Sequence, residues 1–491
     1  MRIEQLIENC GALSVKGDSG REILSIAADS RKVSAGCMFI AVKGFAVDGH
    51  SFISKALEAG AAAIVYDNPQ EEGRWSEGHP EVTFIRVGSS RHALGIIASN
   101  FYGRPSGKLT LVGITGTNGK TTTVTLLYRM FTRLGYSCGL LSTIANYVGG
   151  KMTEAVNTTS DPITINSLLA QMVDEGCAFC FMEVSSIGVE QERIAGLEFR
   201  AGIFSNLTHD HLDYHKTFAE YLRCKKLFFD NLPEDAFAIT NIDDKNGLVM
   251  LQNTKAQKVT YSCRSMADHT CRIMEQGFEG MMLRIDSHET WTRLIGVHNA
   301  YNILAVYTTA VVLGTPEEEA LTAISALASA PGRLENINGP KDITAVIDYA
   351  HTPDALENVL KTLRGIAPDR ELVCLFGCGG DRDRSKRPEM GEIAQKYADR
   401  IFITSDNSRS ERTSDIMEDI KAGMDAGGRA RSIFIEDREQ AIRAALMTAR
   451  EGATVLLAGK GHETYQIIGK EKRHFDEKEI VNEVFNQMGR I

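Results

Sequence analysis

The sequence predicts an α/β protein of three domains, with a P-loop ATPase-like parallel sheet in the centre and a Rossmann-like doubly wound domain at the C-terminus. Three observations support this prediction. Strand and helix patterns alternate along nearly all of the 491 residues. A glycine-rich turn ending in Lys-Thr follows a buried strand near the end of the first quarter of the chain. Beyond residue 332 the alternation resumes with its own apolar strands, as a separate domain would.

The expected domains are residues 1–89, 90–332 and 333–491. In the first, the strand-like run CMFIAVKG precedes an amphipathic helix, SFISKALEAGA, and a second strand, AAAIVYD. In the third, strands are predicted at DITAVIDYA, LVCLFG, RIFITS, SIFIE and TVLLAG. Helices such as DALENVLKTLRGIA and DREQAIRAALMTAR separate these strands, which predicts a doubly wound sheet.

Composition narrows the classes of function. The net charge of −10 disfavours a nucleic-acid-binding surface, and 43% hydrophobic residues are ordinary for a soluble globular protein. Ten cysteines are scattered, and the C-x-x-C pair of Cys177 and Cys180 lies in an apolar run, so buried reduced thiols are expected. Neither a signal-peptide pattern nor a membrane-length apolar run is visible. We therefore expect a cytoplasmic protein that has neither nucleic acid nor membrane as a partner. We also expect a monomer that acts on small molecules, although composition does not dictate this.

The strongest local signal is the segment 109–134. LTLVGIT reads as a buried strand, and VTLLYRMFTRLG carries apolar residues at helical spacing. Between them, three glycines permit a tight turn whose N–H groups converge at the positive end of the helix, which suits phosphate. They are Gly113, Gly116 and Gly119. Lys120 would meet the β and γ phosphates, and the Thr121 hydroxyl would bind magnesium. Because Ile114 occupies the usual glycine position, the motif is a P-loop variant.

Further polar residues of the central domain stand at the predicted carboxyl ends of strands, where α/β sheets bind ligands. Glu183 ends the run CAFCFMEVSS and is a candidate magnesium ligand. AGIFSNL leads into a cluster that would suit a second cation. The cluster contains His209, Asp210, His211, Asp213 and His215. Lys225 and Lys226 lie on the helix YLRCKKLFFD, where a solvated basic pair is the ordinary interpretation.

In the third domain, four polar clusters follow the predicted strands. They are DYAHTPD, GCGGDRDRSKRP, SDNSRSE and GKGHE. Each alone is compatible with an ordinary turn, because glycine, aspartate and asparagine are common turn residues. Together on one edge of a sheet they predict a binding site.

The ordered set of motifs resembles the Mur ligases over nearly the whole chain. The matching segments are GITGTNGKTTT, NTTSDP, EVSS, NLTHDHLDYHKT, CKKLF, GVHNAYN, GRLE, DYAHTPDAL, GCGGDRDRSKRP and AGKGHE, preceded by DSRKVSAGCMFIAVKG in the first domain. The resemblance implies an ATP-dependent amide ligase of cytoplasmic peptidoglycan precursor synthesis. Its chemistry would activate a substrate carboxylate as an acyl phosphate, which an incoming amine then displaces.

The resemblance also implies residue roles. ATP would be bound by Thr117, Asn118, Gly119, Lys120, Thr121, Thr122, Thr123, Asn302, Arg333 and Asp348. The UDP-muramoyl substrate would be bound by Ser30, Asn157, Thr158, Thr159, Ser185, Gln191 and Arg193. Mg²⁺ would be organised by Thr121, Glu183, His211 and Lys225, and catalysis would use Lys120 with the last three. Lys225 would carry a CO₂-derived carbamate (N6-carboxylysine), because a bare ammonium cannot ligate a cation.

The added amino acid is either meso-diaminopimelate or L-lysine in the family members that extend UDP-N-acetylmuramoyl-L-alanyl-D-glutamate. The diaminopimelate signature D-N-P-R appears here as DNSR, with the arginine kept. A guanidinium can bind the second carboxylate of diaminopimelate and would repel a lysine ammonium, so diaminopimelate is predicted. The corresponding site would comprise Arg382, Asp406, Asn407, Ser408, Arg409, Gly459 and Glu463. A lysine-adding ligase, a folylpolyglutamate synthetase-like ligase and a noncatalytic ATP-binding regulator are the alternatives.

Overall fold

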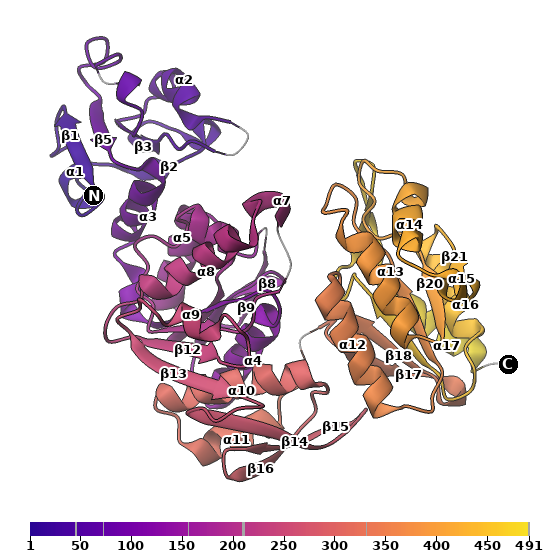
Figure 1. Cartoon of the computed structure of the whole chain (residues 1–491). Coiled ribbons are helices and arrows are strands. Elements are labelled where there is room, and N and C mark those ends of the chain that lie inside the picture. The colour runs from indigo at the N-terminus through magenta and orange to yellow at the C-terminus, as the bar shows by residue number, and fades with distance from the viewer. Residues whose placement is uncertain (45–46, 72, 156, 209–211, 330, 490–491) are drawn as a thin grey trace.

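The computed structural model describes residues 1–44, 47–71, 73–155, 157–208, 212–329 and 331–489. Three α/β bodies follow one another along the chain, and the first and third lie at opposite ends of the view in Figure 1. Within the described residues, each body contains one main β-sheet, and a small hairpin is added to the third. The predicted α/β class is therefore confirmed.

The first body has a five-stranded sheet in the described residues, in the order β1-β5-β4-β3-β2. Its strands are parallel except for β1, which pairs antiparallel with β5. The strands are β1 (Ala12–Lys16), β2 (Ser25–Ala27), β3 (Cys37–Ile40), β4 (Ala63–Tyr66) and β5 (Thr83–Val87). The α-helices are α1 (Ile3–Leu6), α2 (Ile53–Glu58) and α3 (Ser90–Phe101). The predicted helix is α2, and Gly60 follows it at φ +88°, a conformation that suits glycine.

The central sheet has eleven strands in the described residues, in the order β16-β15-β14-β13-β12-β11-β6-β10-β7-β8-β9. The seven neighbouring strands β14, β13, β12, β11, β6, β10 and β7 are parallel, as predicted. At the two edges, β8 and β9 on one side and β15 and β16 on the other pair antiparallel. The strands are β6 (Thr110–Thr115), β7 (Cys138–Leu141), β8 (Ala145–Val148), β9 (Lys151–Glu154), β10 (Phe179–Glu183), β11 (Ala201–Phe204), β12 (Phe237–Asn241), β13 (Gln257–Ser262), β14 (His269–Gly277), β15 (Gly280–Ile285) and β16 (His288–Thr292).

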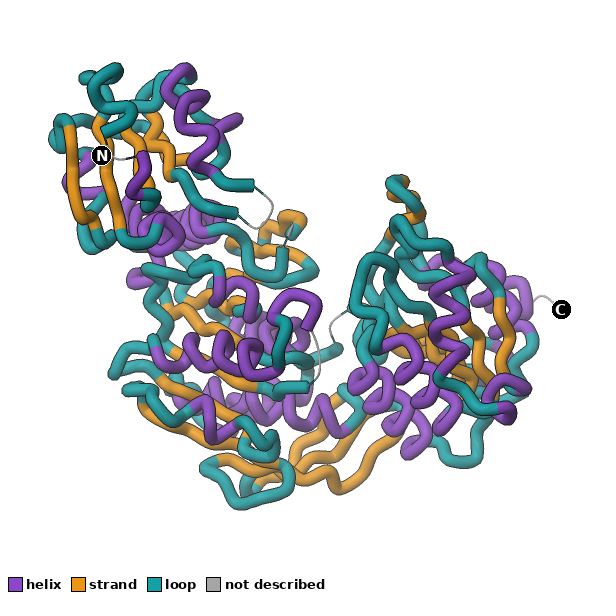
Figure 2. The backbone as a smooth tube through the Cα atoms, turned by 45° about the horizontal axis from the view of Figure 1, so that its top comes forward, coloured by secondary structure: helices purple, strands orange, loops and turns teal. Residues whose placement is uncertain are grey.

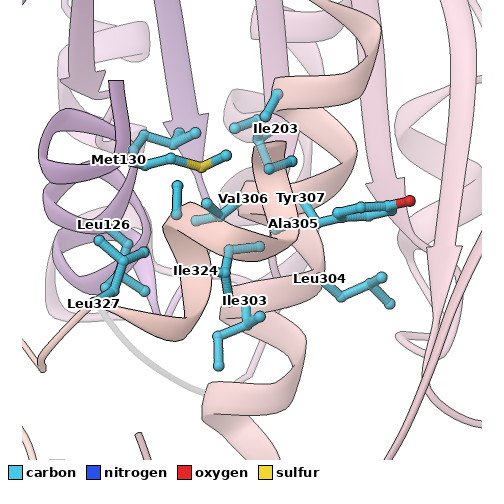
Figure 3. Packing of buried hydrophobic residues seen from close by; sticks show 14 of the residues in the cluster. Leu126, Met130, Ile203, Ile303, Leu304, Ala305, Val306, Tyr307, Ile324 and Leu327 are labelled. Carbon is cyan, nitrogen blue, oxygen red and sulfur yellow. The ribbon is translucent and has the colours of Figure 1, made fainter. Parts of the chain in front are cut away.

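Helices cover both faces of the central sheet. They are α4 (Lys120–Arg133), α5 (Pro162–Asp174), α6 (Ser186–Glu190), α7 (Leu212–His215), α8 (Phe218–Asp230), α9 (Gly247–Met250), α10 (Val297–Val312) and α11 (Glu317–Ser325). One hydrophobic cluster packs α4, α10 and α11 against the sheet, and its side chains include Leu126, Met130 and Ile303 (Figure 3). A second cluster, on α5 and α8, includes Leu169 and Phe228. Leu111 and Val112 alternate between the two clusters, as period-2 side chains of a buried strand must.

The third body has a six-stranded sheet in the described residues, in the order β17-β18-β22-β19-β20-β21, and helices lie on both sides of it (Figure 2). The strands are β17 (Glu335–Asn338), β18 (Thr344–Asp348), β19 (Leu372–Phe376), β20 (Arg400–Ile403), β21 (Ser432–Phe434) and β22 (Thr454–Ala458), with β23 (Tyr465–Ile468) and β24 (Glu471–His474) as the hairpin. The helices are α12 (Pro353–Ile366), α13 (Lys386–Tyr397), α14 (Thr413–Ala422), α15 (Ala426–Ala430), α16 (Arg438–Met447) and α17 (Glu477–Met488). The five predicted strands are β18 to β22, which pair in parallel. Within the six-stranded sheet of the described residues, β17 is the antiparallel strand.

The central and third bodies touch through a strand hairpin as well as through the connecting chain. Asn336 donates a hydrogen bond of 3.1 Å to the carbonyl of Phe278, which lies between β14 and β15. The Arg370 guanidinium lies 5.4 Å from the centroid of the Phe278 ring. Among the described residues, no helix combines the length and the apolarity needed to span a membrane.

Candidate active site

The predicted phosphate turn is present between β6 and α4. Gly116 and Gly119 both have positive φ, at +150° and +88°, and Lys120 begins the helix. A Cβ on Gly116 would lie 2.0 Å from Ser205 Oγ, and one on Gly119 would lie 2.4 Å from Asn302 Oδ1. Glycine is therefore required at both positions by conformation and by space.

Two lysines converge on one carbonyl of this turn. Lys120 Nζ donates to the carbonyls of Gly116 at 2.9 Å and Thr117 at 2.8 Å. Lys225 Nζ, from α8, donates to the same Gly116 carbonyl at 2.8 Å. Lys225 is 1% exposed and its ammonium lies 4.6 Å from the centroid of the Tyr221 ring. Two ammonium groups this close repel each other. The site therefore favours an anion bound between the two lysines or a negatively charged group attached to one of them.

Glu183 lies at the carboxyl end of β10, as predicted, and is fully buried. Thr143, which follows β7, holds both carboxylate oxygens: its N–H donates to Oε1 at 2.9 Å and its hydroxyl to Oε2 at 3.1 Å. The Thr143 hydroxyl also lies 3.1 Å from that of Thr158. A buried carboxylate is thereby held in one orientation, with lone pairs remaining on both oxygens.

A cavity of about 320 Å³ brings together residues predicted for ATP, magnesium and the muramoyl substrate. From the predicted set, its lining contains Thr117, Asn118, Gly119, Lys120, Thr121, Thr122, Asn157, Thr158, Thr159, Glu183, Ser185, Arg193, Lys225 and Arg333. Arg193 Nη1 donates to the Thr159 carbonyl at 2.6 Å, and the Thr159 hydroxyl donates to the Glu183 carbonyl at 3.0 Å. These contacts link the substrate-side loop to the strand that carries the candidate metal ligand.

A second cavity of about 490 Å³ adjoins the first and shares Asn118, Gly119, Thr122 and Arg333 with it. Asn302 and Asp348 line it as well. Asp348 accepts hydrogen bonds of 2.8 Å from the N–H groups of Leu334 and Ala350, which ties the chain entering the third body to β18. Burial raises the pKa of Asp348 although the Arg333 charge opposes the shift.

The residues predicted for the added amino acid form a separate group in the segments that follow β19, β20 and β22. Asn407 is central to it, because its Nδ2 donates to Glu463 Oε2 at 2.9 Å and its Oδ1 accepts from the fully buried Lys460 at 3.3 Å. Lys460 Nζ also lies 3.1 Å from Glu463 Oε2. Burial disfavours ionised Asp406, but Lys460 and Arg438 outweigh this effect and lower its pKa.

Arg409 and Arg382 flank Gly379 in the same group. A Cβ placed on Gly379 would lie 3.1 Å from Arg409 Nη1 and 3.7 Å from Arg382 Cγ. Arg409 Nη1 donates to the Gly380 carbonyl at 2.8 Å. Ser408 is 1% exposed, and its hydroxyl lies 2.7 Å from Thr413 Oγ1. Its side chain therefore supports the loop from the buried side.

Models of known families match three consecutive stretches of the chain. Residues 22–102 match the Mur ligase family catalytic domain, residues 114–310 the Mur ligase middle domain, and residues 332–461 the Mur ligase glutamate ligase domain. The chain belongs to the Mur ligase family.

Relatives of this Mur ligase share its full length. A protein of Cytophaga hutchinsonii named UDP-N-acetylmuramoyl-L-alanyl-D-glutamate–2,6-diaminopimelate ligase is 48% identical over 490 residues, which cover 100% of both chains. Proteins of the same name from Bacteroides thetaiotaomicron and Geobacillus kaustophilus are 48% and 40% identical, covering 99% and 100% of this chain and 100% of each relative.

Solved structures agree with this assignment. One of a UDP-N-acetylmuramoyl-L-alanyl-D-glutamate–2,6-diaminopimelate ligase is 29% identical, covers 100% of this chain and 99% of its own, and superposes with a TM-score of 0.71. A MurF ligase from Thermotoga maritima in complex with ADP has a TM-score of 0.63 at 18% identity, covering 96% of this chain and 99% of its own, and shows likeness of fold alone.

Some predicted residues of this Mur ligase lie apart from the two cavities. Ser30 is in the first body, in a short 3-10 turn that Asp29 caps by accepting from the Arg31 N–H at 2.9 Å. Gln191 contacts Arg193 and the Tyr214 hydroxyl. Thr123 is fully buried, with its hydroxyl 3.4 Å from Asn302 Oδ1.

The expected cation cluster after β11 is described only in part. His209, Asp210 and His211 lie outside the described residues. His215 is buried, and its Nε2 lies 2.8 Å from Ser186 Oγ, so it supports the chain after Glu183. Cys177 and Cys180 are buried free thiols, as predicted.

Thr143 is a residue of the candidate site that the sequence did not indicate. It follows an apolar strand within LLSTIAN, which is the same signal that identified Glu183. Its role depends on β7 lying beside β10, and this neighbourhood is a property of the sheet order.

Proposed function

We propose that this Mur ligase joins meso-diaminopimelate to UDP-N-acetylmuramoyl-L-alanyl-D-glutamate and converts ATP to ADP and phosphate in the same reaction. The observation that supports it most directly is the acceptor group: a guanidinium, Arg409, and a carboxylate, Glu463, held in one loop cluster of the third body. Diaminopimelate presents a carboxylate and an ammonium at its far end, and these two side chains match both charges. The name shared by full-length relatives supports the same substrate.

In this proposal, the chain positions two successive reactions. The γ-phosphate of ATP would lie at Lys120 and the turn N–H groups, where the substrate's D-glutamyl carboxylate attacks phosphorus and ADP leaves. The α-amine of diaminopimelate then attacks the acyl phosphate carbon, the new C–N bond forms, a proton leaves the nitrogen and phosphate departs. Lys120 and Arg333 both line the cavity of about 320 Å³ and would offset the negative charge of the transferring phosphoryl group.

The residues present fit magnesium. The Thr121 hydroxyl and the Glu183 carboxylate line one cavity, and oxygen ligands of this kind are those that Mg²⁺ prefers. When bound, Mg²⁺ would neutralise phosphate oxygens. A carbamate on Lys225 would replace one of two repelling cations with an anion, and we propose it for that reason. His211 is proposed as a further ligand from the family resemblance alone.

The remaining assignments are proposals of the same kind. The ATP, muramoyl and diaminopimelate residues named from the sequence keep those roles, and the domain boundaries are placed at residues 89 and 332. The protein is proposed to act as a cytoplasmic monomer on small molecules.

Phosphate release by the purified protein tests the function. The assay contains ATP, Mg²⁺ and UDP-N-acetylmuramoyl-L-alanyl-D-glutamate, with either meso-diaminopimelate or L-lysine. We expect diaminopimelate to be preferred by at least about a hundredfold in kcat/KM, because lysine would place an ammonium near Arg409. A preference for lysine would overturn the acceptor assignment, and activity with neither would overturn the ligase proposal.

A further inference from the structure

We propose that the β23-β24 hairpin is a clamp for the acceptor loop, residues 405–409, and that Gln466 is its positioning residue. The inference rests on the proposed function, because it concerns how the same loop is held for the added amino acid. The hairpin forms its own two-stranded sheet beside the six-stranded one.

Gln466 joins the hairpin to the loop from inside. Its side chain is fully buried, and its Nε2 donates to Ser405 Oγ at 2.9 Å and to the Asp406 carbonyl at 3.1 Å. Its Oε1 accepts from Arg473 Nε at 3.2 Å and Nη2 at 2.5 Å. Arg473 lies on β24, so this hydrogen-bonded chain runs from the far strand of the hairpin through Gln466 to the loop.

The hairpin backbone holds the loop at two further points. The Ile467 N–H donates to Asn407 Oδ1 at 2.8 Å, and this amide is the one that donates to Glu463. Arg409 is held on both sides, since its N–H donates to the Ile467 carbonyl at 3.3 Å and its carbonyl accepts from the Gly469 N–H at 2.8 Å. Arg409 and Glu463, the two residues proposed to bind the far end of the added amino acid, are therefore both connected to the hairpin, Glu463 through Asn407.

Arg409 needs such a clamp because of its backbone. Its φ is +50°, in the left-handed region that side chains other than glycine adopt at a cost. Without the two backbone bonds, the residue would relax toward negative φ and turn its guanidinium away from Gly380. The side-chain hydrogen bonds of Gln466 in the described structure go to Ser405, Asp406 and Arg473, none of which belongs to the phosphate turn, so its effect should be confined to the amino-acid substrate.

The test compares Gln466→Leu and Arg473→Ala with wild type and with Glu471→Ala. Leu keeps the buried volume and removes the amide, whereas Arg473→Ala changes an exposed residue and removes the support of Gln466 Oε1. Glu471→Ala is the matched control, an exposed position on the same strand. In hydrogen exchange of the full-length protein, the peptide covering residues 405–411 should exchange about tenfold faster in Gln466→Leu than in wild type. Peptides from α4 should be unchanged.

Kinetics give the second readout. The KM for diaminopimelate should rise about tenfold in Gln466→Leu and less in Arg473→Ala, with the KM for ATP and kcat changed by less than about threefold. Conversion of Arg473 to Lys should restore part of the loss. Unchanged exchange in both variants, or KM values for ATP and diaminopimelate that rise together, would overturn the clamp. If the wild-type protein did not use diaminopimelate as a substrate, the proposed function would be refuted instead. The hydrogen-exchange measurement would still test whether the hairpin holds the acceptor loop.

Discussion

Asn118 of the phosphate turn donates a hydrogen bond of 2.9 Å from Nδ2 to Asp354 Oδ2 in the first turn of α12. The contact joins residues 236 positions apart and links the central body directly to the third. It lies where the two cavities share their lining. The nucleotide proposed to bind at the turn and the placement of the third body would therefore act on the same side chain, Asn118.

Replacing Asp354 with Ala should loosen the third body from the central one in the absence of substrates. A hydrogen bond to a charged group contributes about 1.5–3 kcal/mol, enough to shift an open-closed equilibrium roughly tenfold or more. Small-angle X-ray scattering should report a larger radius of gyration. Asp369→Ala, an exposed carboxylate beyond the end of α12, is the control. Identical scattering from wild type and Asp354→Ala would show that other contacts hold the arrangement.

Substitution of Lys225 by Ala should reduce phosphate release at least about a hundredfold, because it removes the group proposed to carry the carbamate. Short carboxylic acids such as acetate should restore part of the activity by occupying the space left. Lys226→Ala is the matched control. Lys226 is the next residue along the helix, and its ammonium pairs with Asp230 at 2.5 Å, outside the site. Full activity of Lys225→Ala would exclude the carbamate.

Arg409→Ala should raise the KM for diaminopimelate about ten- to a hundredfold and leave the KM for ATP nearly unchanged. The lost interaction is a charge-assisted contact with the distal carboxylate, worth about 1.5–3 kcal/mol. Steady-state kinetics with each substrate varied in turn would measure it. Arg412→Ala, whose exposed guanidinium pairs with Asp415 at 2.8 Å, should behave as wild type. An unaltered profile for Arg409→Ala would remove this residue from the acceptor site.

Glu411 should make the third body sensitive to acid. Arg387, which is fully buried, donates to both Glu411 oxygens and is the main cause that lowers the pKa of this carboxyl from 4.5 to about 2. A lowered pKa means that the stabilisation is complete above about pH 4.5 and is lost as the pH falls toward 2. Glu411→Gln should therefore lower the free energy of unfolding by about 2 kcal/mol at pH 7. The loss is limited to this size because Arg387 keeps Asp419 as a second partner.

Calorimetric unfolding at several pH values would measure this effect. The difference in melting temperature between wild type and Glu411→Gln should be constant from pH 7 to 5 and shrink below pH 4.5. Glu418→Gln, an exposed carboxylate on α14 that pairs with Lys421, should show no such difference. A gap that persists unchanged into acid would mean that the carboxylate charge is not its source.

Arg438→Met should destabilise the third body by about 3–5 kcal/mol. Arg438 and Glu477 are 0% and 1% exposed and form a buried ion pair at 2.8 Å, so removal of the cation leaves an uncompensated carboxylate. Arg438 also donates to the carbonyls of Ser405 and Ala458 beside the acceptor loop. The double variant Arg438→Met with Glu477→Leu should recover part of the loss in chemical denaturation. A double variant less stable than the single one would contradict this account.

Sequence patterns predicted the elements whose cause is local. The strand, turn and helix of the phosphate site appear where periodicity and glycine spacing placed them, since φ at Gly116 and Gly119 depends on the residues themselves. The five strands β18 to β22 were each visible as a short apolar run. The antiparallel edges of the central sheet were not predicted, because strand direction follows from how the chain returns and leaves no mark on side-chain alternation.

The sequence by itself determined the family, the phosphate turn and the residue types of the acceptor group. Only the tertiary structure decided which partners hold them: Thr143 on Glu183, Lys225 on the Gly116 carbonyl, and Gln466 behind the acceptor loop. The physical reason is that a hydrogen bond forms between atoms within about 3 Å of each other, whatever their separation along the chain. Local propensity and spacing encode the elements, whereas sheet order and the docking of the third body bring these donors and acceptors together.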